Sequence, residues 1–419
     1  MSGKHGGPKS DRIPSNIILQ IGVATVSRLF LNTARRFPYP FAPTLSRGLG
    51  VPLSAITSLI AANQVTAITG LFFAPLSDRW GYRIMMLAGL AFLAAGMLTG
   101  GLFPFYVPVM VALFLAGLGK SAYDPAMQAY VGERVPFRRR GMAIGLIETS
   151  WAGSSLVGIP LVGFLIHCFD WRAPFFVLGS LGFVGMGALK ILIPGDRNGP
   201  GSSRASITIW SAWRRVVRER AGLGVLGFAF FISIANDNFF VVYGAWLEEE
   251  FRLSIAALGL STTVIGVAEL LAEGLTASLA DRLGLWRSVI IGLILSGTSY
   301  AVLSYLAQTL PMALMALFMV FLTFEFTAVT ALSLSTELVP AVRATMISGF
   351  FAAAGIGRVA GTLIGVRIWM AGDITLIGVF SALMSGVALI SLLWGLWGWR
   401  LPKSSVKVMN SEHGSTPEG

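Results

Sequence analysis

The chain has 419 residues, of which 55% are hydrophobic and only 12% are charged. Soluble globular proteins carry about 25% charged residues, so this composition, with a mean hydropathy of +0.74, excludes an ordinary water-soluble fold. The net charge of +11 would suggest a nucleic-acid-binding protein in a soluble chain, but here the basic residues fall between long apolar segments. The composition therefore predicts a protein whose main solvent is the lipid bilayer.

A membrane-spanning helix needs about 20 apolar residues, and such segments recur along the whole chain. Residues 1–13 are polar and basic and form a predicted N-terminal tail. The following region, 14–193, holds six predicted helices: about 14–35, a segment ending near 73, 84–103, 107–131, 141–167 and a segment ending near 193. A second region, 221–399, holds six more: about 221–246, 254–278, 288–307, 311–334, 345–370 and 373–399. Residues 400–419 form a polar C-terminal tail.

The two regions are separated by a linker at 194–220. Its first part, 194–204, is rich in Gly, Pro, Ser and Arg, which is typical of a flexible connection. From Ile207 to Arg220, tryptophans and valines are set against arginines. This pattern predicts a basic amphipathic helix on the membrane surface, and an unstructured basic linker is the alternative.

A charged motif occupies the predicted turn after the second helix. Residues 74–83 read Ala-Pro-Leu-Ser-Asp-Arg-Trp-Gly-Tyr-Arg, and residues 277–287 read Ala-Ser-Leu-Ala-Asp-Arg-Leu-Gly-Leu-Trp-Arg. The spacing between Asp78 and Asp281 also separates Arg79 from Arg282 and Gly81 from Gly284. Further pairs have nearly the same spacing: Glu133/Glu337, Pro136/Pro340, Arg139/Arg343, Asn32/Asn236 and Tyr39/Tyr243. The chain is therefore predicted to contain two copies of one structural unit.

The motif resembles the loop between the second and third helices of the major facilitator superfamily. Asp78, Arg79, Gly81 and Arg83 match that loop, as do Asp281, Arg282 and Gly284 in the second copy. Alanine stands where the family usually begins the motif with glycine, and Arg287 comes one place late. The resemblance implies an all-α membrane protein with 12 transmembrane helices in two pseudo-symmetric six-helix bundles. It also implies that the motif bridges the two bundles on the cytoplasmic side when the cavity opens outward.

The basic residues predict the orientation in the membrane. They gather in the even-numbered turns, in the linker and in both tails. The opposite loops hold few of them, mainly Arg36, Arg47, Arg172, Arg252 and Arg367. Because positively charged loops remain on the cytoplasmic side, both termini are predicted to be cytoplasmic. The first apolar segment carries Arg28 and has no clear cleavage site, so we expect it to be retained as a helix.

Charged residues within predicted spans are candidate functional residues, because burying an unpaired charge in a membrane is costly. The candidates for binding substrate or protons are Arg28, Lys120, Asp124, Glu148, Asp237, Glu269, Glu273, Glu325 and Arg358. In the proteins that this chain resembles, helices 1, 4, 7 and 10 line the central cavity. The resemblance therefore favours the candidates on those four helices, which are Arg28, Lys120, Asp124, Asp237 and Glu325.

Several candidates have a purely structural alternative. Lys120 and Asp124 are four residues apart on one helix face and could simply neutralise each other. Glu269 and Glu273 have the same spacing but like charges, so one of them would keep a proton unless Arg358 lies close by. Asp237 and Glu273 could also lie near the membrane surface as solvated residues. Carboxylates that exchange protons are what proton coupling requires, so these alternatives bear directly on function.

The predicted fifth helix has a glycine-rich face formed by Gly145, Gly153, Gly158 and Gly163, with Pro160 favouring a kink. It resembles the helix-5 signature of drug-type proton antiporters, which ends in Gly-Pro-x-x-Gly-Gly. Here Ile159 is inserted and Phe164 replaces the final glycine. Close helix packing is the alternative explanation, since small residues allow helix backbones to approach. The arginine that those antiporters carry early in helix 4 is missing, and Lys120 is the nearest cation.

Over about residues 15–400 the chain resembles the drug and sugar (arabinose-type) efflux permeases. This resemblance implies secondary active transport, with efflux of a small organic solute in exchange for protons. Proton-coupled uptake of an organic anion and a non-transporting receptor are the alternatives. The sequence has no nucleotide-binding loop or catalytic constellation, and its three histidines and single Cys168 are too scattered for a metal site. We therefore expect a monomer in the cell membrane that contacts lipid, solute and protons, with no enzymatic activity, cofactor or nucleic acid.

Overall fold

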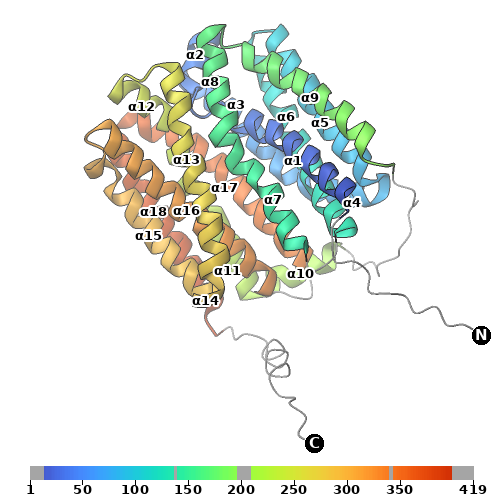
Figure 1. Ribbon diagram of the computed structural model, residues 1–419. Coiled ribbons are helices and arrows are strands. Elements are labelled where there is room, and N and C mark those ends of the chain that lie inside the picture. The colour runs from blue at the N-terminus through green and yellow to red at the C-terminus, as the bar shows by residue number, and fades with distance from the viewer. Residues whose placement is uncertain (1–13, 136–138, 196–208, 339–342, 399–419) are drawn as a thin grey trace, which may run out of the picture.

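The computed structural model describes residues 14–135, 139–195, 209–338 and 343–398. The regular structure in these ranges is helical, and 12 helices are long and apolar enough to cross a membrane. The first six form one bundle, drawn from blue to green in Figure 1, and the last six form a second bundle beside it, drawn from yellow to red. The prediction of an all-α protein with two six-helix bundles is confirmed.

The N-terminal bundle contains six spans, some of which are interrupted. Its elements are α1 (Ser15–Arg36), α2 (Ala42–Leu49), α3 (Leu53–Val65), η1 (Thr66–Thr69), α4 (Gly70–Trp80), α5 (Tyr82–Leu102), α6 (Tyr106–Arg134), α7 (Arg140–Gly153), η3 (Ser154–Gly158), α8 (Ile159–Cys168) and α9 (Ala173–Leu192). The second span runs from α3 through the 3-10 turn η1 into α4. The fifth runs from α7 through the π-helical η3 into α8.

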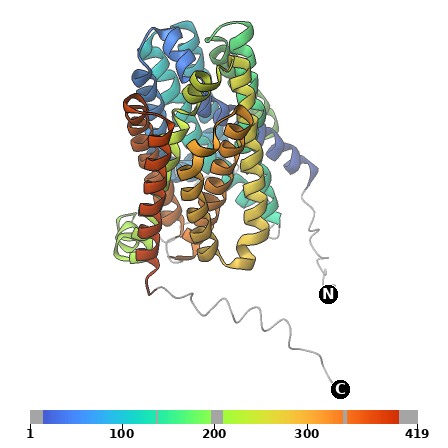
Figure 2. The ribbon, with the colours of Figure 1, turned by 90° about the vertical axis from the view of Figure 1, so that its left-hand side faces the viewer.

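The C-terminal bundle repeats this plan. Helix α10 (Ile209–Arg218) precedes it, and its elements are α11 (Arg220–Phe240), α12 (Tyr243–Phe251), α13 (Ile255–Leu275), η4 (Thr276–Ala280), α14 (Asp281–Leu283), α15 (Leu285–Leu306), α16 (Leu310–Leu338), α17 (Arg343–Ala371) and α18 (Ile374–Leu396). The short helices α2 and α12 lie at the same end of the molecule (Figures 1 and 2). We call that end the cap side, and we call the opposite end, with the turns at Gly81 and Gly284, the turn side.

Two predicted helix ends were too early. The helix of the second span continues beyond 73 to Trp80, and that of the eighth continues beyond 278 to Leu283, whereas the apolar spans themselves end at Phe73 and Ala280. Asp78 and Asp281 therefore lie within helical turns rather than in loops. A charged residue can be part of a helix at its end because the end can lie in the polar headgroup region. The chain reverses only at Gly81 (φ 95°) and Gly284 (φ 87°), where the left-handed backbone favours glycine.

The outer surfaces of the bundles are apolar. Phe72 is 72% exposed and Ile191 is 83% exposed, and many other large apolar side chains are exposed on both bundles. In water such a surface would cause aggregation, whereas lipid tails solvate it. Helix α10 instead has two distinct faces, since Val216 is buried while Arg215 and Arg218 are exposed.

The two bundles meet mainly near the cap side. Helix α3 packs against α17, and α8 packs against α13. A Cβ atom added at Gly163 of α8 would lie 3.1 Å from the Cα atom of Gly259 in α13, so the two backbones are in direct contact. At the rim, Arg47 Nη1 lies 2.7 Å from Glu248 Oε1 and joins α2 to α12. These contacts close the cap side of the molecule.

Candidate functional site

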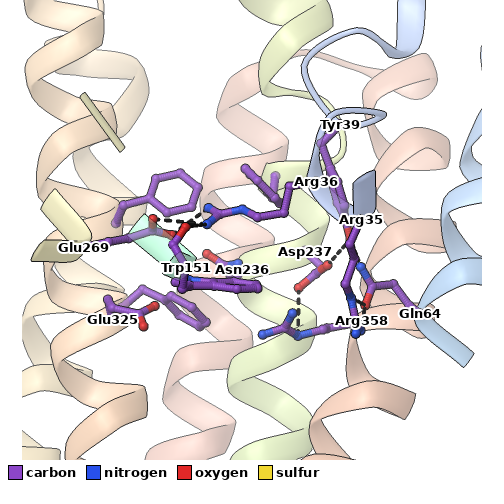
Figure 3. A pocket seen from close by; sticks show the side chains of 13 residues that line it. Arg35, Arg36, Tyr39, Gln64, Trp151, Asn236, Asp237, Glu269, Glu325 and Arg358 are labelled. Atoms are coloured by element: carbon purple, nitrogen blue, oxygen red, sulfur yellow. Dashed lines mark hydrogen bonds and ion pairs between the residues drawn. The ribbon is translucent and has the colours of Figure 1, made fainter. Parts of the chain in front are cut away.

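A pocket lies between the two bundles, with an empty volume of about 370 Å³ including the part open to solvent. Seven spans from both halves contribute side chains, together with the loop after α1, and Figure 3 shows the lining side chains. The lining residues are Arg35, Arg36, Tyr39, Gln64, Trp151, Asn236, Asp237, Phe240, Glu269, Phe321, Phe324, Glu325 and Arg358. Six of these residues are charged and four are Phe or Trp. Polar groups at such a site fix the orientation of a ligand, while aromatic side chains contact its apolar part.

One ion pair crosses the pocket from the N-terminal to the C-terminal bundle. Arg36 Nη2 of α1 donates to Glu269 Oε1 of α13 at 2.6 Å, and Nη1 donates to Oε2 at 3.1 Å. Ser155 donates a further hydrogen bond to Glu269 Oε2 at 3.1 Å. The two charged side chains are 3% and 2% exposed, so water does not screen their attraction. This bidentate ion pair links the two bundles across the pocket.

A second polar chain crosses the pocket at Asp237, which is buried in α11. Tyr39 donates to Asp237 Oδ1 at 2.7 Å and accepts a hydrogen bond from Gln64 at 2.6 Å. Burial first, and then the Asp237 carboxylate, raise the pKa of the Tyr39 hydroxyl well above its usual value. Tyr39 therefore keeps its proton and remains the donor. On the other side, Arg358 Nε lies 3.9 Å from Asp237 Oδ2.

Arg35 and Glu325 lack an oppositely charged partner among the described residues. Arg35 donates to the amide oxygen of Gln64, which is neutral. Glu325 is half-buried on α16 and makes no hydrogen bond or ion pair within the part of the chain that the structure describes. Its side chain lies in the wall formed with Phe321 and Phe324. The pocket thus contains both a cation and a carboxylate without a counter-charge.

The N-terminal bundle has a separate charged cluster that neutralises itself. Arg28 Nε lies 2.9 Å from Asp124 Oδ1, and Arg28 Nη1 lies 3.0 Å from Glu148 Oε2. Lys120 Nζ lies 2.6 Å from Asp124 Oδ2 and donates to Asn32 at 2.6 Å. Two cations therefore face two carboxylates. The geometry of Lys120 and Asp124 fits the structural alternative, in which the two residues neutralise each other.

Trp151 stands between this cluster and the pocket. Its ring centroid lies 4.2 Å from Arg36 Cζ, 5.5 Å from Lys120 Nζ and 5.9 Å from Arg358 Cζ. The negative face of an indole attracts cations at such distances. Trp151 therefore helps to hold three positive groups around the pocket without adding a charge.

The structure divides the predicted candidates into two sets. Asp237, Glu269, Glu325 and Arg358 line the pocket, whereas Arg28, Lys120, Asp124 and Glu148 form the cluster behind Trp151. Helix 4 therefore contributes no lining residue, unlike the helix 4 of the proteins that the chain resembles. Glu273 is half-buried on α13, outside the lining.

The structure corrects the predicted position of Arg36 and decides between the alternatives for two carboxylates. Arg36 was counted among the outer loops, but it belongs to α1 and is buried, because the helix extends to it and Glu269 compensates its charge. For Glu269 the sequence left two alternatives, a retained proton or a nearby Arg358, but its charged partner in the structure is Arg36, and Arg358 contacts the carboxylate of Asp237. Asp237 is 1% exposed, which excludes the alternative of a solvated residue at the surface.

Sequence reasoning missed Arg35, Arg36, Tyr39, Gln64 and Trp151 as lining residues. Arg35 is the last residue of the predicted first helix and Arg36 was assigned to the loop after it, so neither was counted as a charge within a span. Tyr39 was noticed only as a repeat partner of Tyr243. Gln64 and Trp151 are uncharged, so the presence of a charge within an apolar span does not identify them.

The motif on the turn side is described only in part. The side chains of Asp78 and Asp281 lie outside the described part of the structure. Arg79 and Arg282 are exposed, and Arg83 Nη2 donates to the carbonyl oxygen of Lys190 at 2.5 Å. That bond joins α5 to α9 within the N-terminal bundle.

Three of the four glycines on the predicted face of helix 5 lie against other helices, whereas a Cβ atom at Gly145 would meet nothing within 4 Å. A Cβ atom at Gly158 would collide with Thr33 of α1, and one at Gly153 would lie 3.1 Å from Leu29 Cδ1. Gly163 contacts the other bundle, as described above. Pro160 follows the π-helical η3, where the regular hydrogen-bond pattern is interrupted. Close packing thus accounts for these small residues.

Comparison with known sequences gives a consistent family assignment. The model of the Major Facilitator Superfamily matches residues 24–235 and 225–417. The chain is 26% identical to the MFS-type transporter YceJ of Bacillus subtilis strain 168, over 69% of this chain and 73% of YceJ. It is 22% identical to the multi-drug resistance efflux pump PmrA homolog of Lactococcus lactis, over 90% of this chain and 94% of that protein. It is 24% identical to the multidrug resistance protein MdtG of Salmonella arizonae, over 68% and 72%.

Comparison with solved structures supports the same fold. The peptide transporter POT in complex with sulfate superposes with a TM-score of 0.74 at 14% identity, covering 92% of this chain and 94% of POT. A bacterial homolog of the human lysosomal transporter Spinster, in an inward-facing and unoccupied conformation, gives a TM-score of 0.69 at 12% identity, covering 93% and 96%. At these identities the likeness concerns the fold alone.

Proposed function

Because the chain belongs to the major facilitator superfamily of membrane transporters, we propose that it exports a small organic solute in exchange for protons. The main supporting observation is the pocket between the two bundles, where the carboxylate of Glu325 has no oppositely charged partner among the described residues. A carboxylate without a counter-charge can be neutralised by a proton or by a cationic solute. If the proton and the solute compete for this carboxylate, movement of protons in one direction would be coupled to movement of solute in the other.

The efflux direction is supported by the relatives named for multidrug resistance. We propose that the turn side, which carries the basic residues, faces the cytoplasm and that both termini lie there. The closed cap side would then be extracellular, and the described state would be one that loads solute from the cytoplasm. Rocking of the bundles around the pocket would expose it to the other side. In the opposite state, the motif at Asp78 and Asp281 would bridge the bundles.

The alternatives receive less support. Uptake of an organic anion would use Arg28, Lys120 and Arg358, but Arg28 and Lys120 contact Asp124 and Glu148, and Arg358 contacts Asp237. Arg35 is available in the pocket, but the carboxylate of Glu325 lines the same space. A receptor without transport would not need unpaired charges in a pocket between two mobile halves. We also propose that the protein is a monomer in the cell membrane that acts by transport rather than catalysis, without cofactors, and that it binds no nucleic acid.

Transport into inside-out membrane vesicles tests the proposal. Vesicles with an acidic lumen should accumulate a solute from a mixed panel, and a protonophore should abolish the accumulation. We expect at least one of Asp237→Asn, Glu269→Gln and Glu325→Gln to abolish proton-driven accumulation per folded molecule. Glu337→Gln makes the same charge change outside the pocket on α16 and should retain it. Wild-type transport by all three pocket variants would mean that coupling does not use these carboxylates.

A further inference from the structure

The pocket has two ends of opposite charge. Arg36, Glu269 and Glu325 lie at what we call the acidic end (Figure 3). Arg36 is bonded through two nitrogens to Glu269, so the two charges cancel. Glu325 has no such partner among the described residues. The acidic end therefore has one carboxylate more than it has cations when all three groups are ionised.

The other end has the opposite imbalance. Arg35, Asp237 and Arg358 lie there, and we call it the basic end (Figure 3). Arg358 contacts Asp237 at 3.9 Å, while the hydrogen-bond partner of Arg35 is the neutral amide of Gln64. Both cations therefore depend on one carboxylate. The basic end has a surplus of one positive charge when its three groups are ionised.

The neighbouring charges do not correct these imbalances. Arg28 and Lys120 are matched by Asp124 and Glu148 in the cluster behind Trp151. In the view of Figure 3 the Trp151 ring lies between Glu325 on one side and Asp237 on the other, and Arg36 and Arg358 both lie within 6 Å of this ring. The pocket as a whole is close to neutral, but its charges are separated along its length.

We propose that the pocket binds a dipolar organic solute, with a cationic group against Glu325 and an anionic group near Arg35 and Arg358. Its apolar or aromatic body would lie along Trp151 and Phe321, which line the same pocket. A dipolar solute compensates both surplus charges at once, whereas a singly charged solute leaves one of them buried without a partner. The proposal specifies the substrate class of the proposed transport site, and it therefore rests on the proposed function.

Equilibrium binding to the full chain in lipid nanodiscs tests this charge pattern without any proton gradient. The probe is an aminomethyl-naphthoate, whose amine and carboxylate stand at opposite ends of a flat fluorescent ring. Its methyl ester keeps only the positive charge, its N-acetyl derivative keeps only the negative charge, and the doubly blocked compound has neither. We expect the dipolar probe to bind roughly tenfold or more tightly than either singly charged analogue, because each charged contact contributes about that factor.

Two variants assign the ends. In Glu325→Gln, the dipolar probe should lose its advantage over the N-acetyl analogue but keep its advantage over the methyl ester. Arg358→Gln should show the reverse pattern. Glu337→Gln, which removes a carboxylate from the same helix outside the pocket, should change neither comparison. A variant that unfolds is recognised by its thermal transition, and the four-compound comparison on the unmodified chain remains decisive.

Equal binding of the dipolar probe and the methyl ester would overturn the proposal in favour of a cation site. Equal binding of the dipolar probe and the N-acetyl analogue would overturn it in favour of an anion site. Absence of binding by all four compounds would also overturn it, since the proposal names a charge pattern rather than one solute. Vesicle transport separates this result from the proposed function: proton-driven efflux of solutes with another charge pattern would leave the function standing and remove only the substrate class.

Discussion

Arg36 and Glu269 form a charged contact that joins the bundles inside the protein. Each side chain makes two or more polar contacts in this site, and both are almost completely buried. Removing two charges from water is expensive, and only their mutual attraction and additional hydrogen bonds offset that cost. The pair is therefore more sensitive to the loss of one partner than to the loss of both.

Single and double substitutions measure this coupling. Arg36→Gln or Glu269→Gln alone should lower the free energy of unfolding by about 3–5 kcal/mol, because an unpaired buried charge remains. The double variant should be clearly more stable than the sum of the two single effects indicates. Denaturation of the purified protein in a fixed detergent gives the four values. The half-exposed pair Arg47–Glu248 is the matched control, with a coupling of about 0–1 kcal/mol. Additive effects of Arg36→Gln and Glu269→Gln would contradict the assigned contact.

At the scale of elements, the cap side is closed where helix backbones touch. Helix α8 approaches α13 at Gly163 and Gly259, and α3 approaches α17. Small residues make this distance possible, since any larger side chain would separate the axes. The glycine-rich face of helix 5 is therefore part of the contact between the bundles as well as of the packing against α1.

Gly163→Val should open the cap side. Its side chain would press against the α13 backbone, and overpacking of this kind costs about 1–3 kcal/mol. The ratio of closed to open molecules should then fall by roughly fivefold or more. Crosslinking of Arg47→Cys with Glu248→Cys, in a Cys168→Ser background, reports the closed state. Gly145→Val is the control, because a Cβ atom there meets nothing within 4 Å. An unchanged crosslinking yield in Gly163→Val would show that this contact does not hold the cap side closed.

At the scale of the whole molecule, two bundles share one pocket, and their contacts at the cap side fix the present state. The family assignment makes the chain a multi-pass membrane transporter. Which side of the membrane the closed end faces then decides whether this state accepts solute from inside the cell. The distribution of basic residues predicts that the cap side is extracellular.

Chemical labelling tests that orientation. In a Cys168→Ser background, a cysteine introduced at Ser46 in α2 should react with a membrane-impermeant maleimide in intact cells. A cysteine at Ser203, in the linker outside the described residues, should react only after the cells are opened. Labelling of both positions from the same side would refute the predicted topology, and with it the assignment of the loading side.

The sequence by itself determined the membrane location, the number of spans and the division into two halves. Apolar length, glycine turns and repeated charged motifs are local properties, and they remain visible in a linear chain. The sequence also identified Asp237, Glu269, Glu325 and Arg358, because charges within apolar segments are conspicuous. It did not determine which charges meet.

Only the tertiary structure decided the partners. Arg36 lies far from Glu269 in sequence, and the pair forms because two separate bundles bring α1 and α13 together at the pocket. Arg28 and Lys120 looked equally available for a solute, but packing of α1, α6 and α7 gives them carboxylate partners. Whether a buried charge is free or compensated depends on distances of a few ångströms between segments, which no local pattern specifies. The presence of an acidic end and a basic end in the pocket is therefore a property of the tertiary structure.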